Sequence, residues 1–146
     1  MRVRDLLEQK GGKVITVAPG DPLTAAVDLL VKHNIGGLPV LERDGAVVGL
    51  VAERDVVRAV HDHRDTLDRL RVRDVMQIAP LCEIEDNVED AMRRMTARRH
   101  RHLVVRDGAR VAGVISVGDI VKHRLDQLET EASVLRDYVA AHRASH

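Results

Sequence analysis

The spacing of apolar residues changes between strand-like and helix-like along the first 60 residues. A β-branched run at residues 14–17 is typical of a short strand, and apolar residues then recur at helical spacing from Leu23 to Val31. Two further apolar runs, residues 38–41 and 46–51, flank Asp44-Gly45, a dipeptide that favours a hairpin turn. A second helix is predicted from about residue 53 to residue 60. The predicted order is β-α-β-β-α.

Capping residues predict the bounds of the first helix. Asp21 is suited to the N-cap and Pro22 to the first helical position. Asn34 and the pair Gly36-Gly37 are predicted to end the helix before the next strand.

The same pattern recurs in the second half of the chain. Asp86 repeats Asp21 after 65 positions, and Asp119 repeats Asp55 after 64 positions. The offset changes by one residue, as it would between two copies of one unit with loops of different length. We therefore expect each copy to form a small mixed sheet. In each sheet the strands joined through a helix are parallel. One copy alone is too small to bury much surface, so the two copies are expected to pack sheet against sheet.

The repeats divide the chain into four parts. These are a first repeat with its N-terminal opening segment (residues 1–62), a connector (63–71), a second repeat (72–125) and a C-terminal amphipathic helix (126–146). Apolar residues in and before that helix step by 3, 4, 3 and 4, as in a coiled-coil seam: Leu125, Leu128, Ala132, Leu135 and Val139. Such a helix either folds back onto its own domain or pairs between subunits, and we favour a homodimer.

Composition narrows the chemistry of the chain. Its 146 residues include no Phe, no Trp and one Tyr, so a planar ligand would lie against aliphatic side chains. The 23 Lys and Arg residues balance 23 Asp and Glu residues, which argues against an extended surface for nucleic acid or anionic lipid.

The remaining composition bears on the compartment. A single cysteine, Cys82, cannot form a disulfide within the chain, and we expect a packed residue rather than a nucleophile. No apolar run approaches the roughly 18 residues of a membrane span. We therefore expect a cytoplasmic protein with no membrane partner.

The repeats resemble a tandem pair of CBS domains, also called a Bateman module, from Val3 to about Leu125. The resemblance rests on motifs that occur twice in the same order: Val3-Arg4-Asp5 and Val72-Arg73-Asp74, Leu38-Pro39-Val40 and Leu103-Val104-Val105, and the segments 49–55 and 113–119. It implies an α+β fold of two pseudo-symmetric β-α-β-β-α CBS repeats packed sheet to sheet, plus a C-terminal helix. The chain is most similar in layout to short stand-alone bacterial CBS pairs.

This resemblance implies a regulatory module rather than an enzyme. Such modules bind an adenosine nucleotide (AMP, ADP or ATP), or in some cases S-adenosylmethionine, in a cleft between the repeats. The nucleotide would be a regulatory ligand with no catalytic cofactor, and the signal would pass in trans to an unidentified effector protein.

The family motif Gly-h-h-(Ser/Thr)-x-x-Asp assigns the competent cleft to the second copy, which has Ser116 and Asp119, whereas the first copy has Ala52 before Asp55. The carboxylate accepts hydrogen bonds from the ribose hydroxyls, and the serine beside a helix N-terminus suits a phosphate oxygen. The full set that the resemblance assigns to this cleft is Lys10, Ile15, Ile35, Gly36, Gly37, Ile115, Ser116 and Asp119.

Each group in this set has an expected role. Ile15, Ile35 and Ile115 would clamp the purine, and the two glycines would let the backbone approach the ligand. A weaker pseudo-symmetric cleft, with no hydroxyl but more positive charge, would be formed by Val51, Asp55, Pro80, His100, Arg101 and His102.

Plainer interpretations stand beside these assignments. Ser116-x-x-Asp119 is also a capping box, which is compatible with a ligand role. Arg98, Arg99 and Arg101 suit a solvated helix end as well as a phosphate grip.

Other functions remain as alternatives. The residues from Arg98 to Arg101 would be the patch of a nucleic-acid-binding protein, which the missing aromatic residues disfavour. A cryptic enzyme would recruit Glu53, Asp55 or Asp119, but no nucleophile–base pair stands out. The pairs His61-x-His63 and His100-x-His102 lack a matching set of Cys or carboxylate ligands, so no metal site is expected.

Overall fold

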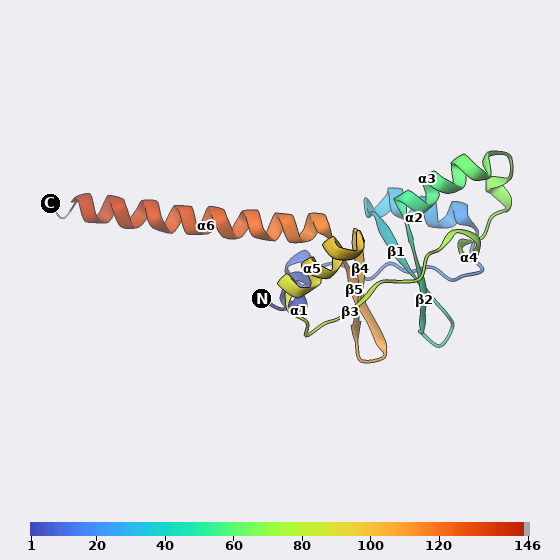
Figure 1. The fold of residues 1–146 in the computed structure, drawn as a ribbon, viewed down its shortest axis with the longest axis horizontal. Helices are drawn as coiled ribbons and strands as arrows, with labels where there is room; N and C mark the ends of the chain where they lie inside the picture. The colour runs from blue at the N-terminus through green and yellow to red at the C-terminus, as the bar shows by residue number, and fades with distance from the viewer. Residues whose placement is uncertain (145–146) are drawn as a thin grey trace.

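The computed structural model describes residues 1–144, which form two α/β halves and a long projecting C-terminal helix (Figure 1). The first half contains α2 (Leu23–His33), β1 (Gly37–Leu41), β2 (Val47–Ala52) and α3 (Glu53–Asp62). The second half contains β3 (Leu81–Glu83), α5 (Val88–Arg98), β4 (His102–Asp107), β5 (Arg110–Ser116) and the start of α6 (Val117–Ala144). Opening helices α1 (Val3–Lys10) and α4 (Val72–Val75) precede the halves, and a 3₁₀ helix (Arg64–Arg69) lies in the connector. The predicted α+β fold class is confirmed.

The predicted hairpin is present in both halves, whereas the predicted parallel pairing forms a strand ladder only in the second half. β1 and β2 form an antiparallel hairpin with Leu38 opposite Val51, and β4 and β5 form its counterpart with Leu103 opposite Ile115. β3 runs parallel to β4, as the connection through a helix requires.

The strand predicted at residues 14–17 is reduced to one parallel bridge between Val17 and Val40. The reason is Pro39. In the second half the equivalent Val104 donates its N–H to the carbonyl of Pro80 at 2.8 Å, whereas a proline has no N–H to donate. The ladder therefore ends at Val17, and the chain before it is free to pass along the cleft between the halves.

The first helix begins one residue later than predicted. Pro22 is the N-cap of α2, and the Asp21 carboxylate instead accepts a hydrogen bond from the backbone N–H of Ala18 at 2.9 Å. Asn34 ends the helix in the left-handed conformation, with φ of 50°.

Each half has its own aliphatic core, and each core is completed by an opening helix. Val3 and Leu6 of α1 are buried with Cys82, Val105 and Ile115 of the second half. Val72 of α4 is buried in the core of the first half, in the cluster that also holds Val17, Leu23, Leu38 and Val51. The first opening helix thus packs on the second repeat and the second opening helix packs on the first.

Matching backbone hydrogen bonds hold the two opening helices. Val3 donates its N–H to the carbonyl of Asp86 at 2.8 Å, and Val72 donates to the carbonyl of Asp21 at 2.9 Å. These contacts are related by the internal repeat, since each joins the start of an opening helix to the turn before the other half's first long helix. The exchange makes each half incomplete without the other half's opening segment.

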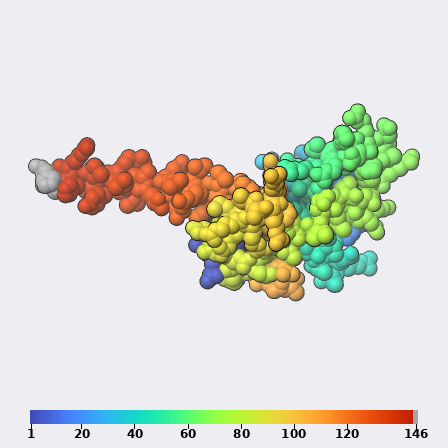
Figure 2. All heavy atoms as spheres, viewed as in Figure 1, coloured from blue at the N-terminus to red at the C-terminus, as the bar shows by residue number. Residues whose placement is uncertain are grey.

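The last helix of the second repeat and the predicted C-terminal helix form one continuous helix, α6, of 28 residues. It leaves the body as an isolated arm (Figures 1 and 2), and Leu128, Leu135 and Val139 are exposed on it. The alternative that this helix folds back onto its own domain is therefore wrong. Residues 145 and 146 of the predicted helix lie outside the described residues.

None of the helices within residues 1–144 combines the length and the apolar character needed to cross a membrane.

The exchange of opening helices predicts a large stability effect at Leu6, which is 3% exposed. Leu6→Ala is expected to lower the free energy of unfolding by about 2–5 kcal/mol, because it removes buried apolar atoms and leaves a void. Val31→Ala on α2, at a position that is 76% exposed, is the control and should change it by less than about 0.5 kcal/mol. Urea denaturation followed by circular dichroism measures both, and equal losses would contradict the packing of α1.

Candidate functional site

A cavity of about 240 Å³ lies between the two halves. One wall is formed by the end of α1, the loop that follows it and the segment between α2 and β1. The other wall is formed by β5 and the first turn of α6. The predicted residues that line this cavity are Lys10, Ile15, Ile35, Gly36, Gly37, Ser116 and Asp119.

Asp119 lies in the first turn of α6 with its carboxylate at the cavity wall. Its Oδ2 accepts hydrogen bonds from the backbone N–H of Ser116 and from Lys10 Nζ, both at 2.9 Å. Within the described part of the chain, no residue donates a hydrogen bond to Oδ1 of Asp119. One carboxylate oxygen is thus used to fix the side chain, while the other is available to hydrogen-bond donors in the cavity.

Ser116 and Asp119 form the capping box that their spacing predicts. The Ser116 Oγ accepts from the backbone N–H of Asp119 at 3.1 Å, reciprocating the bond from Ser116 N–H to the carboxylate. The capping role is compatible with a ligand role, because the box uses only Oδ2 of Asp119.

Lys10 connects the two walls of the cavity. From the last turn of α1, its Nζ donates to the carbonyl of Val114 at 2.9 Å as well as to Asp119 Oδ2. The lysine side chain remains 36% exposed and the aspartate 23% exposed, so the ion pair lies at the rim, in partial contact with solvent.

Ile115 does not line the cavity, although it was predicted to clamp a purine. Its side chain is fully buried in the core of the second half. Successive side chains of a strand point to opposite faces, so Val114 and Ser116 on β5 face the cavity while Ile115 faces the core. The aliphatic surface of the cavity is provided instead by Val14, Ile15, Ile35 and Val114.

His102 lines this same cavity, not the pseudo-symmetric cleft to which it was assigned. Its ring lies against Gly36 and Gly37: a Cβ on Gly36 would come within 2.8 Å of His102 Nε2. The two glycines therefore make room for a histidine of the other repeat, a contact that links the halves across the cleft.

Burial lowers the pKa of His102 below its usual value of 6.5, and the positive charge of Lys10 lowers it further. Asp119 and Glu53 oppose this shift in part. The neutral imidazole is consequently the favoured form at neutral pH.

The pseudo-symmetric position is closed by backbone. Leu50, the counterpart of Val114, exchanges two hydrogen bonds with Gln77, at 2.9 and 3.0 Å. A Cβ on Gly49 would come within 2.7 Å of Met76 Sδ and 2.9 Å of the Gln77 carbonyl. The chain after α4 thus fills, beside β2, the space that is open beside β5.

The residues predicted for that second cleft are correspondingly separated. Val51 is fully buried in the first core, and Asp55 is 8% exposed with Oδ2 accepting from the N–H of Ala52 at 2.8 Å. The carbonyl of Pro80 is used by β4. His100 is half-buried and Arg101 is exposed.

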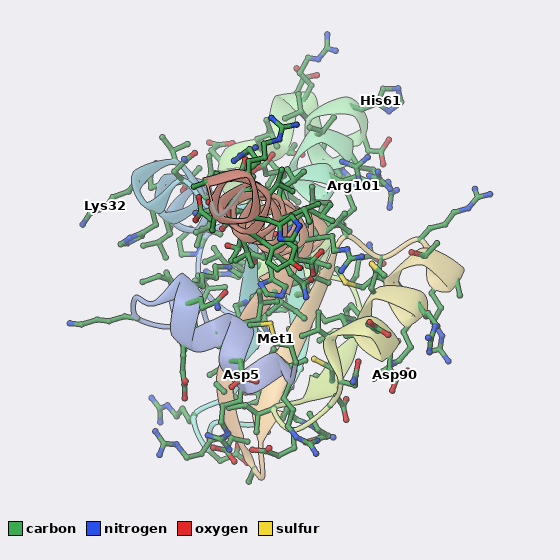
Figure 3. All side chains as sticks on the ribbon, turned by 90° about the vertical axis from the view of Figure 1, so that its left-hand side faces the viewer. Met1, Asp5, Lys32, His61, Asp90 and Arg101 are labelled. Atoms are coloured by element: carbon green, nitrogen blue, oxygen red, sulfur yellow. The ribbon has the colours of Figure 1, made fainter. Side chains whose placement is uncertain are left out.

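The arginines at residues 98–101 do not line the cavity between the halves. Arg99 ends α5 in the left-handed conformation, with φ of 56°. In the view of Figure 3, Arg101 lies toward His61 of α3 and away from Met1 and Asp5 at the start of the chain. The basic residues at the cavity are instead Lys10 and Lys13.

Several cavity residues were not predicted from the sequence. Gly11 and Gly12 turn the chain away from α1 with φ of 65° and 85°, and Lys13 follows them. The Gly-Gly-Lys run was the available signal, because only glycine adopts such angles readily. Asn34 and Gly113 gave no signal that distinguishes a cavity wall from a turn or a strand.

The structure also bears on the single cysteine and on metal binding. Burial raises the pKa of the Cys82 thiol to about 12, so the thiolate is scarce at neutral pH. Among residues 1–144, no cluster of three His, Cys, Asp or Glu side chains is arranged to hold a metal ion.

Comparison with known proteins identifies the family to which this fold belongs. A sequence model of the CBS domain matches the chain twice, over residues 3–62 and 72–126. The chain belongs to the CBS-domain family. As a pair of CBS domains, it is 37% identical to the CBS-domain-containing protein ATU1752 of Agrobacterium tumefaciens, with a TM-score of 0.79, over 85% of this chain and 99% of that one.

Two other relatives bear on ligands and activity. The CBS domain protein PAE2072 of Pyrobaculum aerophilum, solved in complex with AMP, is 25% identical, with a TM-score of 0.78, over 90% of this chain and 99% of that one. Inosine-5'-monophosphate dehydrogenase of Methanocaldococcus jannaschii is 36% identical over 113 residues, 76% of this chain. This CBS pair spans only 22% of that enzyme's length, so the match does not assign the enzyme's activity to this chain.

The pKa of His102 predicts how stability depends on pH. Because the folded pKa lies below 6.5, the unfolded chain binds the proton first, and the free energy of unfolding falls as the pH drops below about 6.5. His102→Gln should lose less stability than the wild type between about pH 7.5 and pH 5.5 in urea denaturation. His33→Gln, at an exposed position, is the control. An unchanged pH dependence in His102→Gln would contradict the burial argument.

Proposed function

We propose that this CBS pair is a regulatory module that binds an adenosine nucleotide in the cavity between its repeats. The observation that carries the proposal is the Asp119 carboxylate, which is fixed through Oδ2 and has Oδ1 free at the cavity wall. An ionised carboxylate in this position suits the two hydroxyls of a ribose. The AMP complex of PAE2072 supports the choice of an adenosine nucleotide.

The remaining walls fit the other parts of such a ligand. The purine would lie between aliphatic side chains of both halves, Ile15 and Ile35 on one side and Val114 on the other. The cavity volume of about 240 Å³ is below the roughly 300 Å³ at the lower end for small-molecule pockets. The phosphates would therefore extend past the rim, where the Gly11-Gly12 backbone and Lys13 are found.

A ligand in this cavity would contact both repeats, so its binding would favour one relative position of the halves. It can shift that equilibrium only by its difference in affinity for the two positions. We infer that a partner protein recognises the relative position of the halves. Helix α6 is the element that would transmit it, because α6 begins at the cavity wall and extends away from the body.

Replacement of Asp119 tests the assignment against a matched control. Asp119→Ala should weaken AMP binding at least tenfold, since each hydrogen bond to a charged group contributes about 1.5–3 kcal/mol. Asp55→Ala removes the pseudo-symmetric carboxylate, which caps α3 in the same way but does not line the cavity, and should leave the affinity unchanged. Isothermal titration calorimetry of ligand-free protein measures both.

Three results would count against the proposal. One is the absence of binding by AMP, ADP and ATP. Another is loss of binding in Asp55→Ala with retention in Asp119→Ala, which would place the ligand at the other cleft. A third is a preference for S-adenosylmethionine over all three nucleotides, which would keep the cavity but change the ligand class.

A further inference from the structure

Helix α6 carries large apolar side chains that the CBS fold leaves in solvent. Leu125, Leu128, Leu135 and Val139 are 54%, 45%, 62% and 40% exposed. The arm that bears them stands clear of the body (Figure 2). A contiguous apolar stripe of this kind marks an interaction surface, unlike scattered single residues.

The stripe has the spacing of a coiled-coil seam. Counted from Val121, apolar residues follow at alternating intervals of four and three as far as Val139: Leu125, Leu128, Ala132, Leu135 and Val139. In heptad terms Leu125, Ala132 and Val139 occupy position a, while Val121, Leu128 and Leu135 occupy position d. Because a helix rises about 1.5 Å per residue, the seam is roughly 27 Å long.

This seam lies on the side of α6 that faces away from the CBS body. Residues of α6 that border the hollow against α1 are Asp119, Lys122, His123, Asp126, Gln127, Thr130 and Glu131. With 100° between successive residues, His123, Asp126 and Thr130 are on the face opposite the seam. Ile120, which enters the core of the second half, is also off the seam. A second helix can therefore reach the seam without displacing α1.

Charges beside the seam are arranged for a parallel pair of identical helices. Arg124 and Glu131 hold position g, and Glu129 and Arg136 hold position e. In a parallel, in-register pair, each g residue lies near the e residue five positions later on the partner. Arg124 then meets the partner's Glu129, and Glu131 meets the partner's Arg136.

These charged side chains make few interactions within their own chain. Within residues 1–144, Glu129, Glu131 and Arg136 form no ion pair. Arg124 donates to the neutral Gln127 Oε1 at 2.8 Å, an exposed contact. Opposite charges are thus available for a partner helix.

An antiparallel pair matches these charges less well. The antiparallel register that keeps all six apolar layers places Leu128 opposite the partner's Ala132. It brings Glu129 near the partner's Glu129 and Lys122 near the partner's Arg136. Like charges at such positions repel. Charge therefore selects the parallel orientation.

We propose that α6 docks on α6 of a second copy of this chain as a parallel, two-stranded coiled coil. The observations that carry it are the exposed a/d seam from Val121 to Val139, its position opposite α1, and the matched charges at e and g. The proposal concerns assembly and does not rest on nucleotide binding. It places the two CBS bodies at the same end of the coil.

Two neighbouring residues provide a matched test of the seam. Leu135 and Val134 are 62% and 63% exposed on one chain, but only Leu135 lies in the seam. The wild type and Val134→Glu should be dimers in sedimentation equilibrium without nucleotide. Leu135→Glu should raise the dimer dissociation constant at least tenfold, because a seam position cannot bury a charge without cost. A thermal melt of each variant checks that the CBS body remains folded.

Disulfide formation tests the orientation. Val139→Cys should form a disulfide-linked dimer under mild oxidation, because position a of one helix faces position a of the other in a parallel pair. Val134→Cys, off the seam, should not. Cys82 does not interfere, being 2% exposed with its thiol pKa raised to about 12.

A monomeric wild type, or a dimer that persists unchanged in Leu135→Glu, would overturn the proposal. So would loss of the dimer in Leu135→Glu without cross-linking of Val139→Cys, since the seam would then pair in another orientation.

Discussion

The exchange of opening helices between the repeats is the constraint on which the rest of this structure depends. Val3 and Leu6 of α1 complete the core of the second repeat, and Val72 of α4 completes that of the first. Neither repeat can close its core alone, so folding holds the two repeats against each other. The same exchange carries the end of α1 across the cleft, where Lys10 reaches Val114 and Asp119 at 2.9 Å.

The internal repeat is broken where the two opening helices end, and this difference leaves a cavity beside β5 while the equivalent edge of β2 is covered. α1 continues to Lys10 and turns through two glycines, leaving the edge of β5 open. α4 ends at Val75, after which Gln77 pairs with Leu50 and covers the equivalent edge of β2. The replacement of the motif serine by Ala52 lies on the covered side, so sequence and geometry both favour the cleft at Asp119.

Local features of the fold were predictable from the sequence because they depend on neighbouring residues. Helical spacing and the turn dipeptides located α2, α5 and both hairpins. The internal repeat predicted that these elements follow in the same order in each half. Contacts between distant segments were less accessible. No helix was predicted for the opening segment, and its local sequence does not indicate that Leu6 enters the core of the second repeat. His102 was assigned to the wrong cleft because its packing on Gly36 is a contact between repeats. The alternation along β5 could have excluded Ile115, since the family motif places Ser116 at the ligand.

The most direct test of a single competent cavity is a crystal structure of the protein with saturating AMP. The account predicts nucleotide density in the cavity between Ile15 and Val114, with the ribose on Oδ1 of Asp119 and the phosphates toward Lys13. Density beside Asp55, or an empty cavity at saturating AMP, would contradict it.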